Sequence, residues 1–394
     1  MSIKILNKEK LLVLCYDWPN NKGGYNKSIL SCIEQYALIY DVTTVIFSED
    51  NFYSQKYNNL DLSFKPVHIL IDAKKYIRSF LYSIITRRPA VEYRYYQSKN
   101  AFIQKINFQN FDYIITQGVL LGRMIEGINL PHIKAKVLMS HDCFHNAYNK
   151  IWKTKNNFQK LPWYFEEKLL KIHEKKSFRL HNKKYAITKH DFNMYNSHGI
   201  NCDGVFHRFP NFNITNNKIE NKRIKKFVTI GRVDDRKSSG LSQFITHVFK
   251  KLKLTDNEYE YHIIGKGSKN FDEPNAGVYG YGFVENLDLF TNNNYIFVNP
   301  QFQVSGLQFK LLYALQNKMV ILSNINSAKG FNQNIQDYML LYQDYKHALK
   351  LIKKYNSNNE FRQKYINKMI TICKSDVFTK NMYSNNYKIL TNFK

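Results

Sequence analysis

The class of fold is most evident in residues 10–47, which have the sequence KLLVLCYDWPNNKGGYNKSILSCIEQYALIYDVTTVIF. Lys10–Tyr16 is a short apolar run of the kind that forms a buried strand, and the polar run over residues 19–24 indicates a turn. Val42–Phe47 is a second continuous, β-branched run. Between them, apolar side chains recur at helical spacing at Ile29, Ile33, Tyr36, Ala37 and Tyr40. Because continuous apolar strands are typical of a parallel sheet covered on both faces, the stretch predicts a βαβ unit.

The same alternation of apolar runs and helical patterns continues along the chain. In the first half, strands are expected at Val67–Ile71, Asp112–Thr116, Lys136–Ser140, Lys184–Thr188 and Val205–Arg208. In the second half, strands are expected at Phe227–Ile230, Tyr261–Ile264, Val278–Tyr281, Tyr295–Val298 and Met319–Ser323. Helices are expected near 240–252, 285–291 and 306–317, with two more in 343–373. The sequence therefore predicts an α/β fold with two Rossmann-like, doubly wound domains facing a central cleft.

Residues 211–226 separate the two series and are rich in Asn and Lys, which indicates a linker. We therefore predict an N-terminal domain over residues 1–210, a C-terminal domain over 227–375 and a polar, aromatic tail over 376–394. The length of 394 residues fits two or three domains.

The composition favours a globular protein with anionic partners. Hydrophobic residues make up 44% of the chain, which excludes a mostly disordered protein. The net charge of +27 favours nucleic acid, an anionic membrane surface or phosphorylated substrates as partners. A coding bias toward Lys, Asn, Ile and Tyr would produce the same excess of charge, so the charge alone does not choose among them.

The cysteines and the hydropathy pattern indicate a cytoplasmic protein. Five widely spaced cysteines without a Cys-x-x-Cys pair argue against disulfides and structural zinc, and they fit a reducing compartment. No signal core is evident, and no stretch reaches the ~18 apolar residues that a membrane span needs. We expect a soluble protein or one that lies peripherally on the inner face of the plasma membrane.

Several catalytic signatures are absent from the sequence. It contains no G-x-G-x-x-G, G-x-x-x-x-G-K-[ST], H-E-x-x-H or G-x-S-x-G, and no Asp-x-Asp pair to clamp the metal of a nucleotide diphosphate. An enzyme with this sequence must stabilise a leaving group with protein dipoles and cations. We therefore predict neither a metal site nor a bound cofactor.

One segment of the second half supplies suitable cations after a strand. Gly231 follows directly on the strand expected at Phe227–Ile230, and a glycine there lets a ligand approach the backbone. Arg232 and Lys237, on the loop beyond it, can pair with phosphate oxygens. The residues leave a solvated charged loop open as the alternative.

A second segment supplies a helix start. The helix near 306–317 is expected to begin at Ser305 or Gly306, with Ser305 as the N-cap. The unpaired N–H groups of Gly306 and Leu307 would then bind an anion, and Lys310 would add a positive charge one turn along. An ordinary capped helix with an exposed lysine is the alternative.

The ordered combination of motifs over about residues 226–335 resembles the donor-binding half of GT-B glycosyltransferases of the large retaining group (the group 1 type), including enzymes of bacterial surface-polysaccharide synthesis. The matching segments are Gly231-Arg232 with Lys237, His262–Gly267, Tyr281–Val284, Asn299-Pro300, Ser305–Leu315, Val320-Ile321 and Lys329–Phe331. The resemblance implies that the second half binds a nucleotide-activated sugar as donor. Its pyrophosphate would lie against Arg232, Lys237, Lys310 and the helix start at Gly306.

The first half resembles the family more loosely. Residues 17–24 match a glycine-rich loop, which implies that Asp17, Gly23 and Gly24 lie near the donor phosphates and the acceptor. His141 and Asp142 follow the strand at Lys136–Ser140, where the family often has a His-Asp pair beside the transferred sugar. His141 would hydrogen-bond the donor sugar or the acceptor, with a purely structural histidine as the alternative, and Asp142 would orient it or act alone. Glu174 also follows the family pattern, and the tail is expected to pack back on the N-terminal domain.

The sequence departs from the family at Tyr313, where a glutamate usually holds the nucleotide ribose. A tyrosine hydroxyl can still hydrogen-bond a ribose, but the departure keeps open a catalytically impaired binding or scaffold subunit. A basic nucleic-acid-binding protein is the weaker third alternative, because the basic, aromatic stretches at 74–105 and 150–176 lack a nucleic-acid fold signature. In the family, such stretches face the acceptor and often the anionic leaflet.

As a whole, the resemblance implies a metal-independent, retaining transferase. It would move a sugar from the nucleotide-activated donor to a glycan or lipid-linked acceptor in the synthesis of a cell-surface polysaccharide such as capsule or lipopolysaccharide. In a front-face retaining transfer, the departing phosphate can accept the acceptor's proton, so no protein nucleophile is needed.

Overall fold

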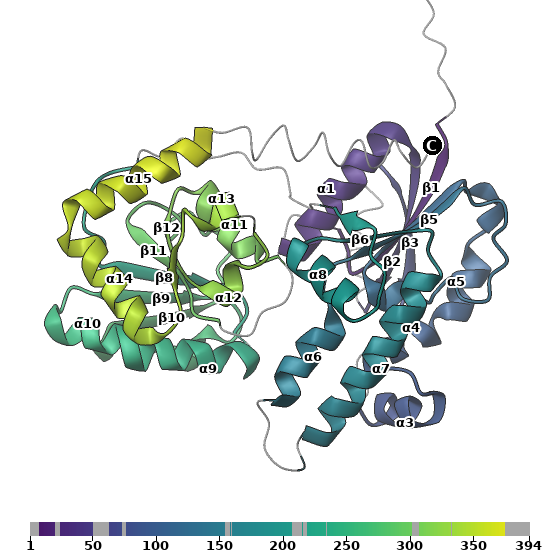
Figure 1. Cartoon of the computed structure of the whole chain (residues 1–394), viewed down its shortest axis with the longest axis horizontal. Coiled ribbons are helices and arrows are strands. Elements are labelled where there is room, and N and C mark those ends of the chain that lie inside the picture. Colours follow the sequence, from purple (N-terminus) through teal and green to yellow (C-terminus); the bar gives the residue numbers. More distant parts are fainter. Residues whose placement is uncertain are drawn as a thin grey trace, which may run out of the picture. The chain divides into compact units, whose positions relative to one another are not determined.

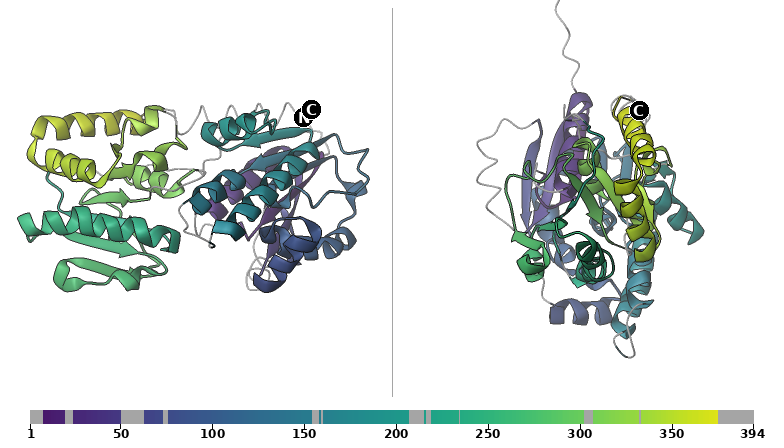
Figure 2. Two further views of the ribbon diagram at one scale, coloured as in Figure 1. Left: turned by 60° about the horizontal axis from the view of Figure 1, so that its bottom comes forward. Right: turned by 90° about the vertical axis from the view of Figure 1, so that its left-hand side faces the viewer.

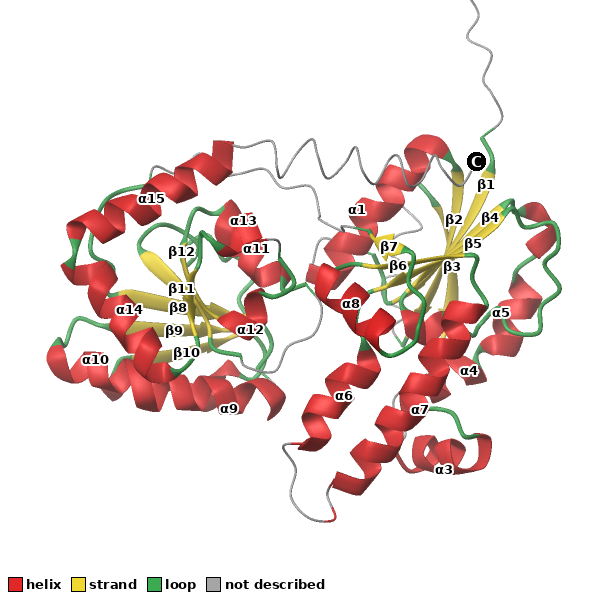
Figure 3. Cartoon of the chain, viewed as in Figure 1, coloured by secondary structure: helices red, strands yellow, loops and turns green. Residues whose placement is uncertain are grey.

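The structure, a computed structural model, describes residues 8–19, 24–49, 63–72, 76–153, 158, 160–206, 215, 219–233, 235–301, 307–331 and 333–374. These residues divide into two compact units (Figure 1), with the described residues up to 206 in the first and those from 215 in the second. Each unit is a parallel sheet covered by helices (Figure 3). Among the described residues, no helix is both long and apolar enough to cross a membrane.

The first unit contains a seven-stranded parallel sheet with the strand order β3-β2-β1-β4-β5-β6-β7. The strands are β1 Lys10–Tyr16, β2 Asp41–Ser48, β3 Lys65–Leu70, β4 Tyr113–Gln117, β5 Ala135–Ser140, β6 Lys183–Ala186 and β7 Gly204–Val205. The helices are α1 Gly24–Ile39, α3 Tyr76–Thr86, α4 Tyr93–Gln97, α5 Lys99–Lys105, α6 Phe144–Lys153, α7 Lys160–Arg179 and α8 Lys189–Ser197. The chain starts at β1, grows outward to β3 and then returns to β4 on the other side of β1.

Both faces of this sheet are buried, which explains why its strands are continuously apolar. Leu11 and Val13 point into a core that also contains residues of α1, such as Ile33. Leu12 and Leu14, the alternate residues of β1, point into a second core on the other face. The sequence-based expectation of a parallel sheet covered on both faces is therefore confirmed.

The second unit contains a six-stranded parallel sheet with the order β10-β9-β8-β11-β12-β13. The strands are β8 Lys226–Ile230, β9 Glu260–Ile264, β10 Val278–Gly282, β11 Tyr295–Asn299, β12 Val320–Asn324 and β13 Leu340–Tyr342. The helices are α9 Asp235–Phe244, which continues through a π-helical turn into α10 Lys250–Thr255, and then α11 Phe309–Gln316, α12 Ile325–Ala328, α13 Gln333–Gln336, α14 Tyr345–Ser357 and α15 Asn359–Lys374. Here too the chain starts in the middle, at β8, and reverses its direction of growth between β10 and β11.

One local expectation for the second unit is wrong, and one strand was missed. The helix expected near residues 285–291 is a series of turns, in which the Asn286 side chain accepts a hydrogen bond from the Asp288 backbone N–H at 2.8 Å. Such short-range bonds from Asn compete with helical hydrogen bonds. The edge strand β13 was not expected, because its three residues are too few to show a periodic pattern.

The part of the expected linker that the structure describes packs with the second unit. Ile224 is buried, and its backbone N–H and C=O both hydrogen-bond the Asn356 side chain of α14, at 2.9 and 3.0 Å. The tail at 376–394 lies outside the described residues.

The middle of α9 packs closely against the chain just after β11. A β-carbon at Gly240 would lie 2.6 Å from the backbone oxygen of Pro300, so only glycine fits without a shift of backbone. We expect Gly240→Ala to lower the free energy of unfolding by about 1–3 kcal/mol through this clash, although alanine is the better helix former. Ser239→Ala, at the exposed neighbouring position, is the matched control and should be neutral or stabilising. Equal melting temperatures of the two variants in calorimetry would contradict the close packing.

Candidate functional site

In each sheet, the reversal of the chain creates a switch point at which the two bordering strands send their connections to opposite faces. Ligands of open α/β sheets bind outside the carboxyl ends of the strands at such points. The switch point lies between β1 and β4 in the first unit and between β8 and β11 in the second. The predicted site residues Asp17 and Gly231 each follow directly on one of these strands.

His141 follows β5, and its ring is held by side chains from the switch point of the first unit. It is 4% exposed, and its Nε2 donates to the Oε1 of Gln117, the last residue of β4, at 3.1 Å. The Gln117 amide nitrogen in turn donates to the Tyr36 hydroxyl of α1 at 2.9 Å. The Tyr16 ring of β1 lies 6.1 Å from the imidazole ring. His141 and Asp17 therefore lie at the same edge of the first sheet, the one formed by the carboxyl ends of its strands.

Asp17 is exposed and adopts a left-handed backbone conformation, with φ of 70°. Its carboxylate accepts hydrogen bonds from the Trp18 backbone N–H at 2.8 Å and from the Asn26 side chain of α1 at 3.2 Å. Asp17 thus caps the turn between β1 and α1. Gly23 lies outside the described residues, and Gly24 is the first residue of α1.

The loop after β5, which carries Asp142, is tied down by a buried carboxylate. Glu174 of α7 is fully buried, and its Oε1 accepts the Phe144 backbone N–H, at the first residue of α6, at 2.7 Å. The Tyr195 hydroxyl of α8 donates to the backbone oxygen of Asp142 at 2.8 Å. A negative side chain at the amino end of α6 is electrostatically favourable. Glu174, expected from the resemblance, therefore fixes the course of the chain directly after Asp142.

Cys143, His145 and Glu174 form a buried group whose ligand atoms lie within 4.8 Å of one another. The Nδ1 of His145 hydrogen-bonds the Oε2 of Glu174, so both carboxylate oxygens of Glu174 are already engaged by α6. Burial and then the charge of Glu174 raise the pKa of the Cys143 thiol far above its ordinary value. The neutral thiol and the engaged carboxylate fit a group that positions the loop better than one that ligates a metal.

Asp191 of α8 is a titratable group beside this loop that sequence reasoning missed. It is fully buried, and its Oδ2 accepts the Thr188 hydroxyl at 2.6 Å while the Thr188 oxygen caps the Asp191 N–H. Burial, opposed by the hydrogen bond from Thr188 and reinforced by the charge of the neighbouring Asp142, raises the pKa of Asp191 to about 7. The Thr-x-x-Asp spacing, typical of a helix start, was the available signal.

At the switch point of the second unit, no neighbouring atom covers the backbone at Gly231. Gly231, directly after β8, has φ of 128°, and a β-carbon there would meet no atom within 4 Å. Its backbone oxygen lies against Gly265, whose β-carbon would lie 2.3 Å away, so the loops after β8 and β9 approach as only glycine permits. Arg232 is exposed next to Gly231. This geometry agrees with a ligand that approaches the backbone at Gly231.

The helix after β11 begins later than expected. α11 starts at Phe309, and its N-cap is Gln308, which makes no capping bond through its side chain. Leu307 is buried outside the helix, so its backbone N–H does not belong to the first helical turn, which is a correction to the sequence-based expectation. Hydrophobic burial of Leu307 anchors the chain before the helix. Ser305 and Gly306 lie outside the described residues.

Lys310 and Tyr313 lie three residues apart on α11, both half-buried, and therefore on one face of the helix. Lys237 lies in the first turns of α9, but its side chain is outside the described part of the chain. The Asn299 side chain, at the end of β11, donates to the Ser323 hydroxyl at 3.4 Å. Its Oδ1 is buried without a hydrogen-bond partner among the described residues, so it is a further polar group at this switch point.

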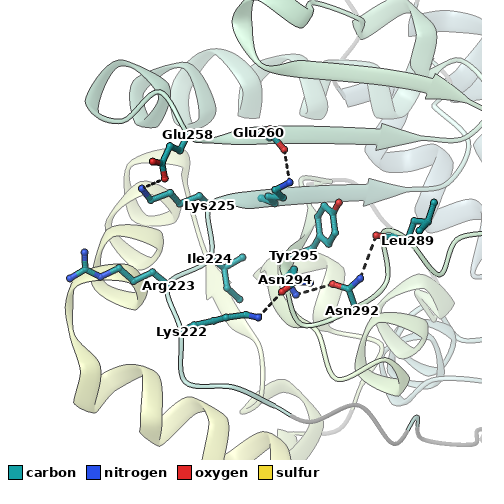
Figure 4. A pocket seen from close by; sticks show the side chains of 11 residues that line it. Lys222, Arg223, Ile224, Lys225, Glu258, Glu260, Leu289, Asn292, Asn294 and Tyr295 are labelled. Atoms are coloured by element: carbon teal, nitrogen blue, oxygen red, sulfur yellow. Dashed lines mark hydrogen bonds and ion pairs between the residues drawn. The ribbon is translucent and has the colours of Figure 1, made fainter.

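A pocket of about 640 Å³ in the second unit lies at the opposite, amino-terminal edge of the sheet (Figure 4). Its lining includes Lys226, Glu260 and Tyr295, the first residues of β8, β9 and β11. The lysines of this pocket are paired with acidic side chains, for example Lys226 with Glu260 at 3.1 Å and Lys225 with Glu258 at 2.6 Å. Because these charges are already compensated, the pocket is a poorer site for a phosphate than the edge at Gly231.

The raised pKa of Asp191 predicts how stability depends on pH. The folded state binds a proton more tightly than the unfolded state, so ionising this carboxyl destabilises the protein progressively as pH rises from about 4 to 7. We expect Asp191→Asn to remove this loss and to stabilise the protein by about 2–4 kcal/mol at pH 8 relative to pH 4. Melting temperatures measured across this range test the prediction, with Asp288→Asn at an exposed position as the control. A gain that does not change with pH would contradict it.

No family model matches the chain, and no curated protein matches it in sequence. Several solved structures match its fold over nearly the full length. A TarM variant from S. aureus, in complex with fondaparinux, alpha-GlcNAc-glycerol and UDP, has a TM-score of 0.65 at 11% identity over 98% of this chain and 100% of its own. WaaG, a glycosyltransferase involved in lipopolysaccharide biosynthesis, has a TM-score of 0.61 at 11% identity over 98% and 99%.

The sucrose-phosphate synthase from Thermosynechococcus elongatus has a TM-score of 0.67 at 12% identity over 98% of this chain and 99% of its own. At these identities the likeness concerns the fold alone. The two doubly wound parallel sheets and these matches show that the chain has the GT-B fold, as the resemblance in sequence predicted.

Proposed function

We propose that the protein is a glycosyltransferase that takes the sugar of a nucleotide-activated donor and transfers it to a glycan or lipid-linked acceptor. The observation that carries the proposal is the open strand end of the second unit, where the Gly231 backbone faces empty space beside the exposed Arg232. The complex of TarM with UDP supports a nucleoside diphosphate as the group that this edge binds.

The donor site in this proposal combines cations and helix starts around the β8–β11 switch point. Arg232 can bind pyrophosphate oxygens through two parallel N–H bonds, and Lys310 adds a second charge from the first turn of α11. Lys237 lies near the start of α9, which follows β8 as α11 follows β11. The amino ends of both helices favour an anion at the same edge of the sheet. Tyr313 would face the ribose, one turn beyond Lys310.

In this proposal the acceptor meets the loop after β1, which carries Asp17, and the loop after β5, which carries His141 and Asp142. His141 would hydrogen-bond the donor sugar or the acceptor, and its bond to Gln117 fixes the orientation of the ring. Asp142 lies beside it on a chain that Glu174 and Tyr195 hold in place. A side chain whose orientation is fixed before the substrate binds loses less conformational entropy in the complex, which favours precise positioning.

The proposed chemistry breaks the bond between the anomeric carbon and the β-phosphate oxygen, while the acceptor hydroxyl forms the new bond to that carbon. The positive charges of Arg232, Lys237 and Lys310 would stabilise the departing nucleoside diphosphate as its charge develops. The departing phosphate oxygen would take the hydroxyl proton in a retaining transfer on one face of the sugar. No metal ion and no protein nucleophile has a role in this scheme.

The class of acceptor is inferred from two of the matching structures. WaaG is involved in lipopolysaccharide biosynthesis, and the TarM complex contains alpha-GlcNAc-glycerol, so we propose a cell-surface glycan or its lipid-linked precursor at the inner face of the plasma membrane. Because the sucrose-phosphate synthase has the same fold, transferase assays should also include soluble sugar phosphates as acceptors.

Nucleotide binding tests the donor site directly. We expect calorimetry to detect binding of UDP or another nucleoside diphosphate, and Arg232→Ala or Lys310→Ala to weaken it by about 1.5–3 kcal/mol, or ~10–100-fold. Arg223→Ala and Lys251→Ala are the matched controls, because both remove an exposed charge elsewhere in the second unit. Equal loss of affinity in the controls would indicate a nonspecific effect of charge, and a protein that binds random DNA more tightly than any nucleotide would favour the nucleic-acid alternative.

A binding or scaffold subunit without transferase activity is the second candidate, and Tyr313 in place of the family's glutamate is the observation that favours it. We expect Tyr313→Glu to tighten binding of a nucleoside diphosphate severalfold, because a carboxylate can accept hydrogen bonds from both ribose hydroxyls. Tyr313→Phe separates loss of the hydroxyl from loss of the ring. Nucleotide binding without transfer or hydrolysis of any nucleotide sugar, in both the unaltered protein and Tyr313→Glu, would favour the scaffold over the enzyme.

A further inference from the structure

The pocket of about 640 Å³ in the second unit has a size that suits a small molecule (Figure 4). Because the strands of this sheet are all parallel, their first residues meet at one edge, and the pocket lies there (Figure 2). Gly231 lies at the opposite edge, so the proposed donor site does not account for this pocket. We call it the amino-edge pocket. Its lining comes from β8, β9 and β11 and from the chain segments that precede these strands.

The lysines of the amino-edge pocket are paired with acidic side chains. The pairs are Lys222 with Glu220 at 2.7 Å, Lys225 with Glu258 at 2.6 Å and Lys226 with Glu260 at 3.1 Å. Arg223 also belongs to the lining, but it is exposed and Figure 4 shows it pointing away from the pocket. An anionic ligand would compete with the carboxylates for each lysine, and a cationic ligand would meet the lysines themselves. An uncharged ligand therefore fits best.

The Glu260 carboxylate is held in place by neighbouring strands and still has one oxygen to offer. Its Oε2 pairs with Lys226 of β8 at 3.1 Å and accepts the Nε2–H of His262 at 3.2 Å. The Nδ1 of His262 accepts a hydrogen bond from the Tyr281 hydroxyl of β10 at 3.0 Å. Burial lowers the pKa of His262, which agrees with a neutral ring that donates one of these bonds and accepts the other. Oε1 of Glu260 has no hydrogen-bond partner among the described residues.

Two hydrogen-bond donors of the lining are also uncommitted. Tyr295 is only 8% exposed, yet its hydroxyl makes no hydrogen bond within the part of the chain that the structure describes. Burial raises the pKa of this hydroxyl, and the charges of Lys226 and Glu260 both act on it. The Oδ1 of Asn294 accepts a hydrogen bond from Lys222 at 2.6 Å, whereas no described residue accepts one from its Nδ2. Because a buried polar group without a partner is costly, the Tyr295 hydroxyl favours a ligand that completes its bonding.

We propose that the amino-edge pocket binds an uncharged saccharide and is a glycan-binding site separate from the proposed donor site. A sugar hydroxyl both donates and accepts hydrogen bonds, so it can donate to Glu260 and accept from Tyr295 or Asn294. Ile224 and Leu289 supply apolar surface for the C–H groups of a sugar ring, and Leu289 is 74% exposed. The inference goes beyond the proposed transferase activity, since this pocket would bind a saccharide even in a protein that transfers no sugar.

Saturation-transfer NMR of the full-length protein with maltotriose, cellotriose and triacetylchitotriose tests the proposal. We expect at least one of these neutral sugars to bind. Tyr295→Phe removes only a hydroxyl and should weaken the binding about 3–10-fold. Glu260→Gln removes a charged acceptor and should weaken it about tenfold or more. The matched control is Tyr279→Phe, which changes a half-buried tyrosine of β10 that stacks on His262 at 5.3 Å but does not line the pocket. The control should bind the sugar as the unaltered protein does.

Four outcomes would overturn the proposal. Two are the absence of binding to all three sugars and an equal loss of affinity in Tyr279→Phe and Tyr295→Phe. The third is displacement of the sugar by inorganic phosphate, because the pocket would then prefer an anion. The fourth is binding that UDP or His141→Ala abolishes and Tyr295→Phe leaves unchanged, which would place the sugar at the proposed transfer site. Melting temperature verifies that each variant is folded, and UDP binding by the same variants separates failure of this proposal from failure of the donor site.

Discussion

Burial of both faces of each parallel sheet is the constraint on which the rest of the structure depends. In β1, successive residues such as Leu11 and Leu12 enter different cores, so neither face of the sheet can hold a solvated polar group. Polar groups that must meet a ligand can then lie only beyond the strand ends. His141 and Asp142 after β5, and Gly231 and Arg232 after β8, are in such positions. Strand register thus determines which side chains share an edge, and burial of the faces explains why the chemistry is placed there.

The loops at these edges need support from buried groups, because an unsupported loop would lose conformational entropy whenever it bound a ligand. Glu174 supplies it in the first unit by accepting N–H groups at the start of α6. In the second unit, the support is the close approach of glycine backbones at Gly231 and Gly265. The two units therefore use different means. A buried carboxylate holds a loop through hydrogen bonds, whereas the glycine backbones hold theirs through close packing.

The sequence allowed the strands and their parallel arrangement to be predicted, because apolar runs such as Lys10–Tyr16 are continuous and separated by helical periodicity. It did not reveal where α11 starts, since the burial of Leu307 outweighs the local signals of Ser305 and Gly306. The roles of Gln117 and Asp191 depend on contacts between residues far apart in the chain, which no local pattern encodes. Which residues follow the strand ends could therefore be predicted, whereas the partners that orient their side chains could not.

A buried ion network around Glu92 attaches the turn that follows α3 to the core of the first unit. Glu92 hydrogen-bonds Arg88 at 2.8 Å and His173 of α7 at 3.0 Å, and Arg123 lies 4.0 Å away. Burial alone would raise the pKa of Glu92, but His173, Arg88 and Arg123 hold it below its usual value. Because an unpaired charge at this depth would be strongly destabilising, the network resists displacement of the turn. The position of the turn therefore depends on three side chains from different parts of the first unit, which meet at one buried carboxylate.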